Sequence, residues 1–187
     1  MRKILLFVWA CMGLVCLMSA CKTSVKSKER KLVWVEDFDQ KNSFDESVWT
    51  KIPRGTSDWN NYMSYYDSCY AMQDGNLILR GIANHTQKND TAPYLTGGVY
   101  TKGKKLFTGG RVEVCARLQA AKGAWPAIWM LPEKAEWPKG GEIDIMERLN
   151  HDHIAYQTTH SYYTHILGIK DNPPHGGINK INPEEYN

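Results

Sequence analysis

One stretch decides the fold of this chain: Gly140-Gly141-Glu142-Ile143-Asp144-Ile145-Met146-Glu147. Polar and apolar residues alternate at its start, which predicts a β-strand with one polar and one apolar face. On a helix, Glu142 and Asp144 would point about 200° apart, whereas on a strand they share a face. Glu147 is out of phase by one residue, and a β-bulge returns it to that face. We therefore predict a bulged strand that carries three carboxylates on one side.

Three carboxylates on one face repel one another, which raises the pKa of at least one of them. A carboxyl group that keeps its proton near neutral pH is what general acid catalysis requires. Two other interpretations remain open: a solvated sheet edge whose acids favour solubility, and a site for Ca²⁺ or Mg²⁺. The Trp-rich segment before the strand disfavours the first. The second is disfavoured because acids on a rigid strand do not wrap around an ion as a ligand-rich loop does.

The hexapeptide from Glu142 to Glu147 resembles the catalytic signature of glycoside hydrolase family 16, in the bulged form with one extra residue before the last Glu. Three further segments resemble that family in the same order: 109–118, 123–132 and Trp137-Pro138. The resemblance implies a β-jelly-roll sandwich, concanavalin A-like, with a concave substrate cleft. Composition alone indicates only an all-β fold, because many short apolar runs are separated by Gly, Asn and Pro turns.

The remaining elements are predicted from local patterns. Strands are expected at 32–38, at 76–80 after a turn at Gly75, at 111–118 and at 155–160, whereas 168–186 reads as a loop. No segment sustains a helical period. Residues 32–187 are expected to form the catalytic domain. Members of the family continue with several more strands, so the domain is predicted to be incomplete at its C-terminus.

Hydrolysis of a glycoside needs a proton for the leaving oxygen and a group that meets the developing oxocarbenium ion. The distance between the two carboxylates decides between retention and inversion of configuration, and sequence does not supply it. The resemblance implies retention, with Glu142 as the nucleophile, Glu147 as the general acid/base and Asp144 between them. The alternatives are a sugar-binding module without chemistry and a structural surface lipoprotein. The presence of all three acids disfavours both.

Aromatic residues before the strand are candidates for the sugar-binding surface, because sugar C–H faces pack on indole rings. These are Trp125, Trp129 and Trp137, although each also suits a packed core. His160 falls where many family members carry a His on the neighbouring strand, and it either orients a carboxylate, contacts the sugar or packs. A second aromatic group is predicted to pack a long loop: Trp59, Tyr62, Tyr65, Tyr66 and Tyr70.

No cofactor and no metal ligand are predicted, with a structural calcium ion left open. Four histidines are interpreted as loop residues because they show no zinc spacing: His151, His153, His165 and His175. Beyond Cys21 only Cys69 and Cys115 remain. They could pair in an oxidising compartment, but sequence does not show that they do.

The N-terminus is predicted to be a lipoprotein signal peptide over residues 1–20. Arg2 and Lys3 precede an apolar run that ends at about Met18 and is short for a membrane span. The ending 17–21 resembles a bacterial lipoprotein signal, in which Cys21 is lipidated; an ordinary signal with incidental cysteines is the alternative. Residues 21–31 read as a flexible tether. The protein is expected to be exported and anchored in a membrane, at the outer membrane or the cell surface.

Charge excludes one class of partner. The chain has 23 Lys and Arg against 20 Asp and Glu, and its formal charge falls from +3 to +1 once Arg2 and Lys3 leave with the signal. Neither nucleic-acid binding nor an acidic membrane patch is implied by such a balance. The expected partners are a polysaccharide or glycan substrate, and a membrane through the lipid on Cys21.

The substrate remains open between β-1,3-glucan and β-galactoside chains. The bulged signature resembles the laminarinase-like branch of the family. The residues after it, 148–152, depart from the aromatic residue and Gly of typical laminarinases. The run 156–161, Tyr-Gln-Thr-Thr-His-Ser, resembles endo-β-galactosidase-like members instead.

Overall fold

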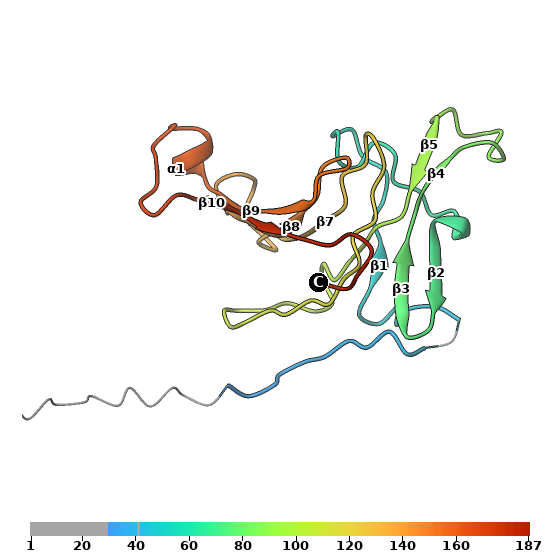
Figure 1. The fold of residues 1–187 in the computed structure, drawn as a ribbon, viewed down its shortest axis with the longest axis horizontal. Helices are drawn as coiled ribbons and strands as arrows, with labels where there is room; N and C mark the ends of the chain where they lie inside the picture. The colour runs from blue at the N-terminus through green and yellow to red at the C-terminus, as the bar shows by residue number, and fades with distance from the viewer. Residues whose placement is uncertain (1–29, 41) are drawn as a thin grey trace, which may run out of the picture. The chain divides into compact units, whose positions relative to one another are not determined.

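The computed structural model describes residues 30–40 and 42–187 (Figure 1). The predicted signal peptide, Cys21 and most of the predicted tether lie outside the described residues. Within the described part, no helix is both long and apolar enough to cross a membrane. The chain divides into two units, Met1–Glu36 and Asp37–Asn187. The architecture below is that of the second unit.

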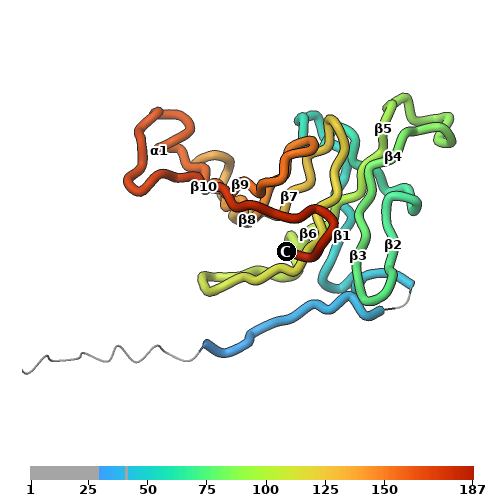
Figure 2. Tube along the Cα trace, viewed as in Figure 1, coloured from blue at the N-terminus to red at the C-terminus, as the bar shows by residue number. Residues whose placement is uncertain are grey.

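A four-stranded antiparallel sheet carries the acidic stretch, with the strand order β10-β9-β8-β7 (Figures 1 and 2). Its strands are β7 (Ala127–Met130), β8 (Glu142–Glu147), β9 (Ile154–His160) and β10 (Gly176–Lys180). The predicted acidic strand is therefore confirmed, and so is the strand expected at 155–160. Because β8 is an inner strand, it is hydrogen-bonded on both sides, which excludes the sheet-edge interpretation.

Three two-stranded ladders make up the rest of the assigned strands. They pair β1 (Thr50–Lys51) with β6 (Val99–Tyr100), β2 (Tyr70–Gln73) with β3 (Asn76–Leu79), and β4 (Gly81–Ala83) with β5 (Tyr94–Thr96). The turn between β2 and β3 places Asp74 at φ 52° and Gly75 at φ 70°. Two consecutive positive φ values are the requirement of a type I′ hairpin turn, so the predicted turn at Gly75 is confirmed.

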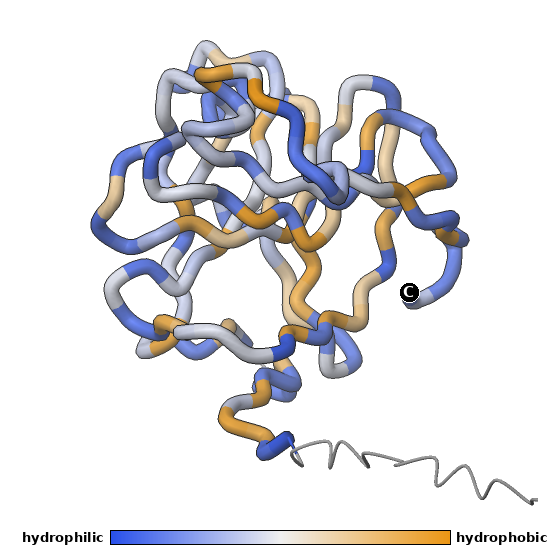
Figure 3. The backbone as a smooth tube through the Cα atoms, turned by 90° about the vertical axis from the view of Figure 1, so that its left-hand side faces the viewer, coloured by the Kyte–Doolittle hydropathy of each residue, from blue (hydrophilic) through white to orange (hydrophobic). Residues whose placement is uncertain are grey.

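Helix is scarce in the described residues. It consists of the 3-10 turn η1 (Asp67–Cys69) and the single-turn α1 (Tyr162–His165), which follows β9. Hydrophobic and hydrophilic residues alternate in short stretches along the tube rather than in long runs (Figure 3). The predicted all-β class is confirmed.

The hydrophobic core lies on the face of the sheet opposite the acids. Leu118, Met146 and Ala155 are buried together. Partly buried apolar residues pack against them: Ala116, Ile128 and Ile181. Ile128 pairs with Met146 across β7 and β8, so both side chains point to the same face. The core thus anchors the strand from behind while its acids face the other way.

Two predicted strands are absent from the described residues. No strand is assigned at 32–38, where Leu32 and Val33 are 74% and 80% exposed. Phe38 has φ 49°, which lies outside the β region. β-branched and aromatic composition favours a strand only where the backbone stays in the β region and the tertiary context completes a ladder.

The strand predicted at 111–118 is also not assigned in the structure. Its alternation survives only at its end, where Ala116 is partly buried and Leu118 is buried, while Val112 and Val114 are exposed. Ala116 exchanges two backbone hydrogen bonds with Asn187, at 3.2 and 2.9 Å, which is too little pairing to make a strand. The predicted loop 168–186 was wrong in part, because β10 lies within it.

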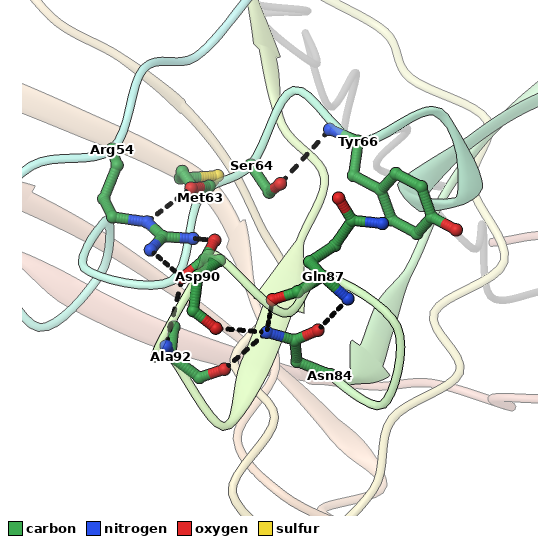
Figure 4. Close-up of polar contacts among 8 residues, drawn as sticks. All are labelled: Arg54, Met63, Ser64, Tyr66, Asn84, Gln87, Asp90 and Ala92. Atoms are coloured by element: carbon green, nitrogen blue, oxygen red, sulfur yellow. Dashed lines mark hydrogen bonds and ion pairs between the residues drawn. The ribbon is translucent and has the colours of Figure 1, made fainter.

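A polar cluster ties the β4–β5 loop to the segment 54–66 (Figure 4). The Arg54 guanidinium binds both carboxylate oxygens of Asp90, at 2.6 and 2.7 Å, and its Nε donates to Met63 O at 2.9 Å. Asn84 Nδ2 donates to Asp90 O at 2.8 Å and to Ala92 O at 3.0 Å. A bidentate Arg–carboxylate pair fixes orientation as well as distance, so the cluster holds these two loops together.

Candidate active site

The register of β8 confirms the predicted bulge. On the β9 side, Asp144 pairs with Thr158 and Glu147 pairs with Tyr156, so three steps on β8 match two on β9. On the β7 side, Met146 still pairs with Ile128, which identifies Ile145 as the extra residue. The β9 partners of the three acids are His160, Thr158 and Tyr156, which alternate along one face. Glu142, Asp144 and Glu147 therefore share that face, as predicted.

Asp144 is the buried member of the three acids, with 5% of its surface exposed. Burial is the main cause that raises its pKa to about 6, and the negative charges of Glu142 and Glu147 add to it. His160 acts in the opposite direction, and its Nε2 lies 3.2 Å from Asp144 Oδ2. That contact has the distance of an ion pair but not the angles of a hydrogen bond. Asp144 Oδ2 is therefore buried without a hydrogen-bond donor among the described residues.

Glu142 marks one end of the acidic row. Its Oε2 accepts a hydrogen bond from the indole Nε1 of Trp137 at 2.5 Å. The Trp137 ring in turn meets His165 edge to face, with centroids 4.5 Å apart, and lies 6.4 Å from the His160 ring. Three aromatic rings therefore gather beside this carboxylate.

His165 is a residue that sequence reasoning missed, because it was interpreted as a loop residue. It is the last residue of α1, whose start is fixed by a capping box between Ser161 and Thr164. The Ser-x-x-Thr spacing is a signal that would have found the helix start. No sequence signal indicates the contact with Trp137, because that contact depends on how two loops meet.

Glu147 marks the other end of the row. Its Oε1 accepts a hydrogen bond from the indole Nε1 of Trp125 at 2.8 Å. Trp125 and Trp137 are 46% and 48% exposed, so about half of each side chain is accessible beside a carboxylate. A half-exposed indole next to an acid suits the stacking of a sugar ring.

Trp129 is a residue of β7, and it lies between the indoles of Trp125 and Trp137. It pairs with Asp144, which places its side chain on the acidic face. Trp59, predicted to pack a long loop, meets the Trp129 ring edge to face at 5.0 Å. All seven predicted site residues of the described chain thus come together: Glu142, Asp144, Glu147, Trp125, Trp129, Trp137 and His160.

The described residues contain no group of three or more His, Cys, Asp or Glu side chains arranged to hold a metal ion. Cys69 is buried, Cys115 is exposed, and both are free thiols, so the open question of their pairing is answered in the negative.

Comparisons with known proteins agree with this geometry. The family described as "XgeA-like, catalytic GH16 domain" matches residues 81–176, just over half of the chain. The chain is 42% identical to the keratan-sulfate endo-1,4-beta-galactosidase of Sphingobacterium multivorum over 144 residues, which are 74% of this chain and 34% of that protein. It is 33% identical to a beta-glucanase of Rhodothermus marinus, over 83% of this chain and 57% of that protein. The chain thus spans only part of the length of these relatives.

Among solved structures, the laminarinase catalytic domain of Thermotoga maritima is similar, with a TM-score of 0.68 and 28% identity. The match covers 83% of this chain and 67% of the laminarinase chain. The described chain accordingly has the predicted β-jelly-roll fold. Because the family match extends over the β8 strand and its three acids, the chain belongs to glycoside hydrolase family 16.

Proposed function

We propose that this protein is an endo-acting glycoside hydrolase that cleaves internal β-glycosidic bonds of a polysaccharide or glycan. One observation carries the proposal. The outer acids of a three-carboxylate strand each accept a hydrogen bond from a half-exposed indole, and a buried carboxyl lies between them. The family membership supports the same conclusion.

In the first step, the Glu142 carboxylate attacks the anomeric carbon while the bond to the leaving oxygen breaks. Glu147, as a carboxylic acid, gives its proton to that oxygen. The product is a sugar bound covalently to Glu142. In the second step, water attacks the anomeric carbon, gives its proton to the Glu147 carboxylate and frees Glu142, so that configuration is retained.

The neighbours of the two acids suit these roles. The Trp137 indole orients the carboxylate of Glu142 through a charge-assisted hydrogen bond. Asp144, whose pKa is raised to about 6 by burial and by the charges of Glu142 and Glu147, retains a proton more readily than an exposed carboxyl. A proton held there reduces the electrostatic repulsion along the row of acids.

For the substrate, β-galactoside chains are favoured because the relative with 42% identity is a keratan-sulfate endo-1,4-beta-galactosidase. β-1,3-Glucan is the second candidate, supported by the similar laminarinase domain and by the bulged signature. Incubation of the full-length protein with keratan sulfate, a mucin glycan, laminarin and lichenan tests both. Oligosaccharides released from one substrate, with sizes that fall over time, would identify the endo mode and the substrate class together.

The variant Glu142→Gln separates an enzyme from a sugar-binding module of the same fold. The neutral amide keeps the shape of the side chain and removes the nucleophile, so an enzyme loses turnover while it still binds the glycan. Turnover that survived the change would remove Glu142 from the proposed mechanism.

We also propose that the protein is an exported lipoprotein anchored through Cys21, as the sequence of residues 1–21 predicts. Cys21→Ala is expected to move the protein from the membrane fraction to the soluble fraction, and Cys16→Ala is the matched control. Equal soluble pools in Cys21→Ala and wild type would contradict the anchor.

A further inference from the structure

The segment that carries Trp125 has no regular structure of its own. Residues 111–126 contain no assigned strand or helix, and β7 begins only at Ala127. Even so, Trp125 Nε1 lies 2.8 Å from Glu147 Oε1. An irregular loop holds a side chain at hydrogen-bond distance only when other contacts fix its backbone.

Those contacts come from the turn that follows β8. Arg148 N donates to Pro126 O at 3.0 Å, and Asn150 N donates to Ala124 O at 2.9 Å. The side-chain oxygen of Asn150 accepts the N–H of Gly123 at 2.6 Å. The three hydrogen bonds lie on both sides of Trp125 in the sequence, so the turn brackets the loop around this one residue.

Arg148 strengthens the same attachment from inside. It is only 3% exposed, and its guanidinium donates to the carbonyls of Asp152 and Leu118. Leu118 belongs to the hydrophobic core, so the start of the Trp125 loop is tied to that core. A buried guanidinium is costly unless its donors find acceptors, and here backbone carbonyls accept from Nε and Nη1.

Asn150 is suited to its place by two properties. It has φ 53°, a left-handed conformation that Asn, Asp and Gly adopt more readily than other residues. Its amide oxygen also accepts a hydrogen bond from the N–H of Gly123. A glycine in place of Asn150 would leave that N–H without this acceptor. The backbone conformation and the hydrogen bond can therefore be tested separately.

We propose that Asn150 is a positioning residue: through the Gly123–Trp125 loop it sets the indole against Glu147 and so controls proton transfer by that acid. The inference rests on the proposed function. Asn150 does not act on the sugar itself. Its effect is confined to the steps that need Glu147, because Glu142 is held from the other end of the strand by Trp137.

The test compares three variants of the full-length protein. Asn150→Gly keeps the backbone conformation and removes the acceptor, whereas Asn150→Asp keeps both. Asp74→Gly is the control for a Gly placed at positive φ, because Asp74 has φ 52° in the β2–β3 turn. Each variant is assayed on the natural glycan and on an aryl glycoside of the same oligosaccharide, whose phenolate leaves without a proton.

Asn150→Gly is expected to lose about 10- to 100-fold of its rate on the glycan, because general acid–base assistance is weakened. Its initial burst of phenolate is expected to stay, and azide is expected to accelerate its turnover of the aryl glycoside. Asn150→Asp and Asp74→Gly should resemble the wild type. A phenolate burst slowed as much as the rate on the glycan, or no loss on the glycan in Asn150→Gly, would overturn the proposal.

A second measurement tests the positioning of Trp125 independently of the proposed hydrolase activity. The measurement is tryptophan fluorescence, in which the contribution of Trp125 is the part of the emission that Trp125→Phe removes. The wavelength of this contribution is expected to shift in Asn150→Gly and to be unchanged in Asn150→Asp. If the wild type hydrolysed none of the glycans, the proposed function would have failed, and this emission would still decide the positioning. An unshifted emission would overturn it.

Discussion

The two ends of β8 hold their acids by the same hydrogen bond but fix the donor differently. At the Glu147 end, Trp125 lies in a loop that is bracketed by two backbone hydrogen bonds and by a third that the Asn150 side chain accepts. At the Glu142 end, Trp137 sits in a turn closed on itself by the hydrogen bond from Gly140 N to Glu136 O, 2.9 Å. Its ring is supported from outside by His160 and His165.

This difference indicates which end of β8 can adjust its geometry to a bound sugar. Backbone hydrogen bonds set position within narrow limits of distance and angle, whereas an edge-to-face ring contact contributes about 0.5–1.5 kcal/mol and tolerates sliding. The Glu147 end is therefore expected to keep one geometry for proton transfer. The Glu142 end is expected to adjust to the sugar that binds on Trp137. The following predictions test this contrast, from the largest expected effect to the smallest.

Removal of the acids themselves should separate the two ends most clearly. Glu142→Ala and Glu147→Ala are each expected to lose at least about 1,000-fold of the rate on the glycan. With an aryl glycoside and azide, Glu147→Ala should give a glycosyl azide of retained configuration, because the intermediate on Glu142 still forms. Glu142→Ala should give the inverted azide. NMR of the products checks this, and the same configuration from both variants would contradict the assignment.

Asp144 lies between the two ends of β8, and its titration is expected to affect the pH dependence of the free energy of unfolding. The folded-state pKa of Asp144, about 6, is above its ordinary value of 3.8. Between those values the folded protein binds more protons than the unfolded chain, so the free energy of unfolding falls as pH rises through this window. The loss is expected to reach about 3 kcal/mol above pH 6.

Asp144→Asn removes this titration and should flatten the profile between pH 4 and 6. Denaturant unfolding at several pH values measures the effect. The exposed carboxylate of Glu113 gives a control, Glu113→Gln, which is expected to leave the profile unchanged. A wild-type profile that rose through this window would contradict the buried, protonated Asp144.

The indole donors come next in size. Trp125→Phe and Trp137→Phe each remove a hydrogen bond to a carboxylate, and each is expected to lower the rate on the glycan about tenfold or more. Trp125→Phe should spare the phenolate burst from an aryl glycoside, whereas Trp137→Phe should slow it. Trp59→Phe is the control, because the Trp59 ring contacts the Trp129 ring, and its hydrogen bond to Asp58 comes from the backbone N–H, which the substitution keeps. Identical profiles for the two variants would remove the contrast between the ends.

The smallest effect is expected from His165→Ala, which removes one ring contact from Trp137. A loss of about 0.5–1.5 kcal/mol corresponds to about two- to tenfold, mostly in KM, because Trp137 also offers its face to the sugar. Kinetics on the glycan measure it, beside His85→Ala at an exposed position as the control. A larger fall in kcat than in affinity would show that this end is as rigid as the other.

Sequence reasoning succeeded where one short stretch contained the whole signal. Alternation and one extra residue predicted β8, its bulge and the shared face of Glu142, Asp144 and Glu147. It failed at 32–38 and 111–118, because a strand exists only with a partner and composition does not supply one. His165 and Asn150 escaped it for a related reason: their roles are contacts between loops far apart in sequence.

The bulge at Ile145 has a consequence for how such strands diverge. If Ile145 were lost, Met146 and Glu147 would keep their partners Ile128 and Tyr156, and the remaining residues would alternate without interruption. Two lengths of this strand thus carry the same three acids on the same face. Loss of one residue between Asp144 and Glu147 is therefore expected to keep the three acids on one face, whereas loss of Ile143 would turn Glu142 or Asp144 toward the core.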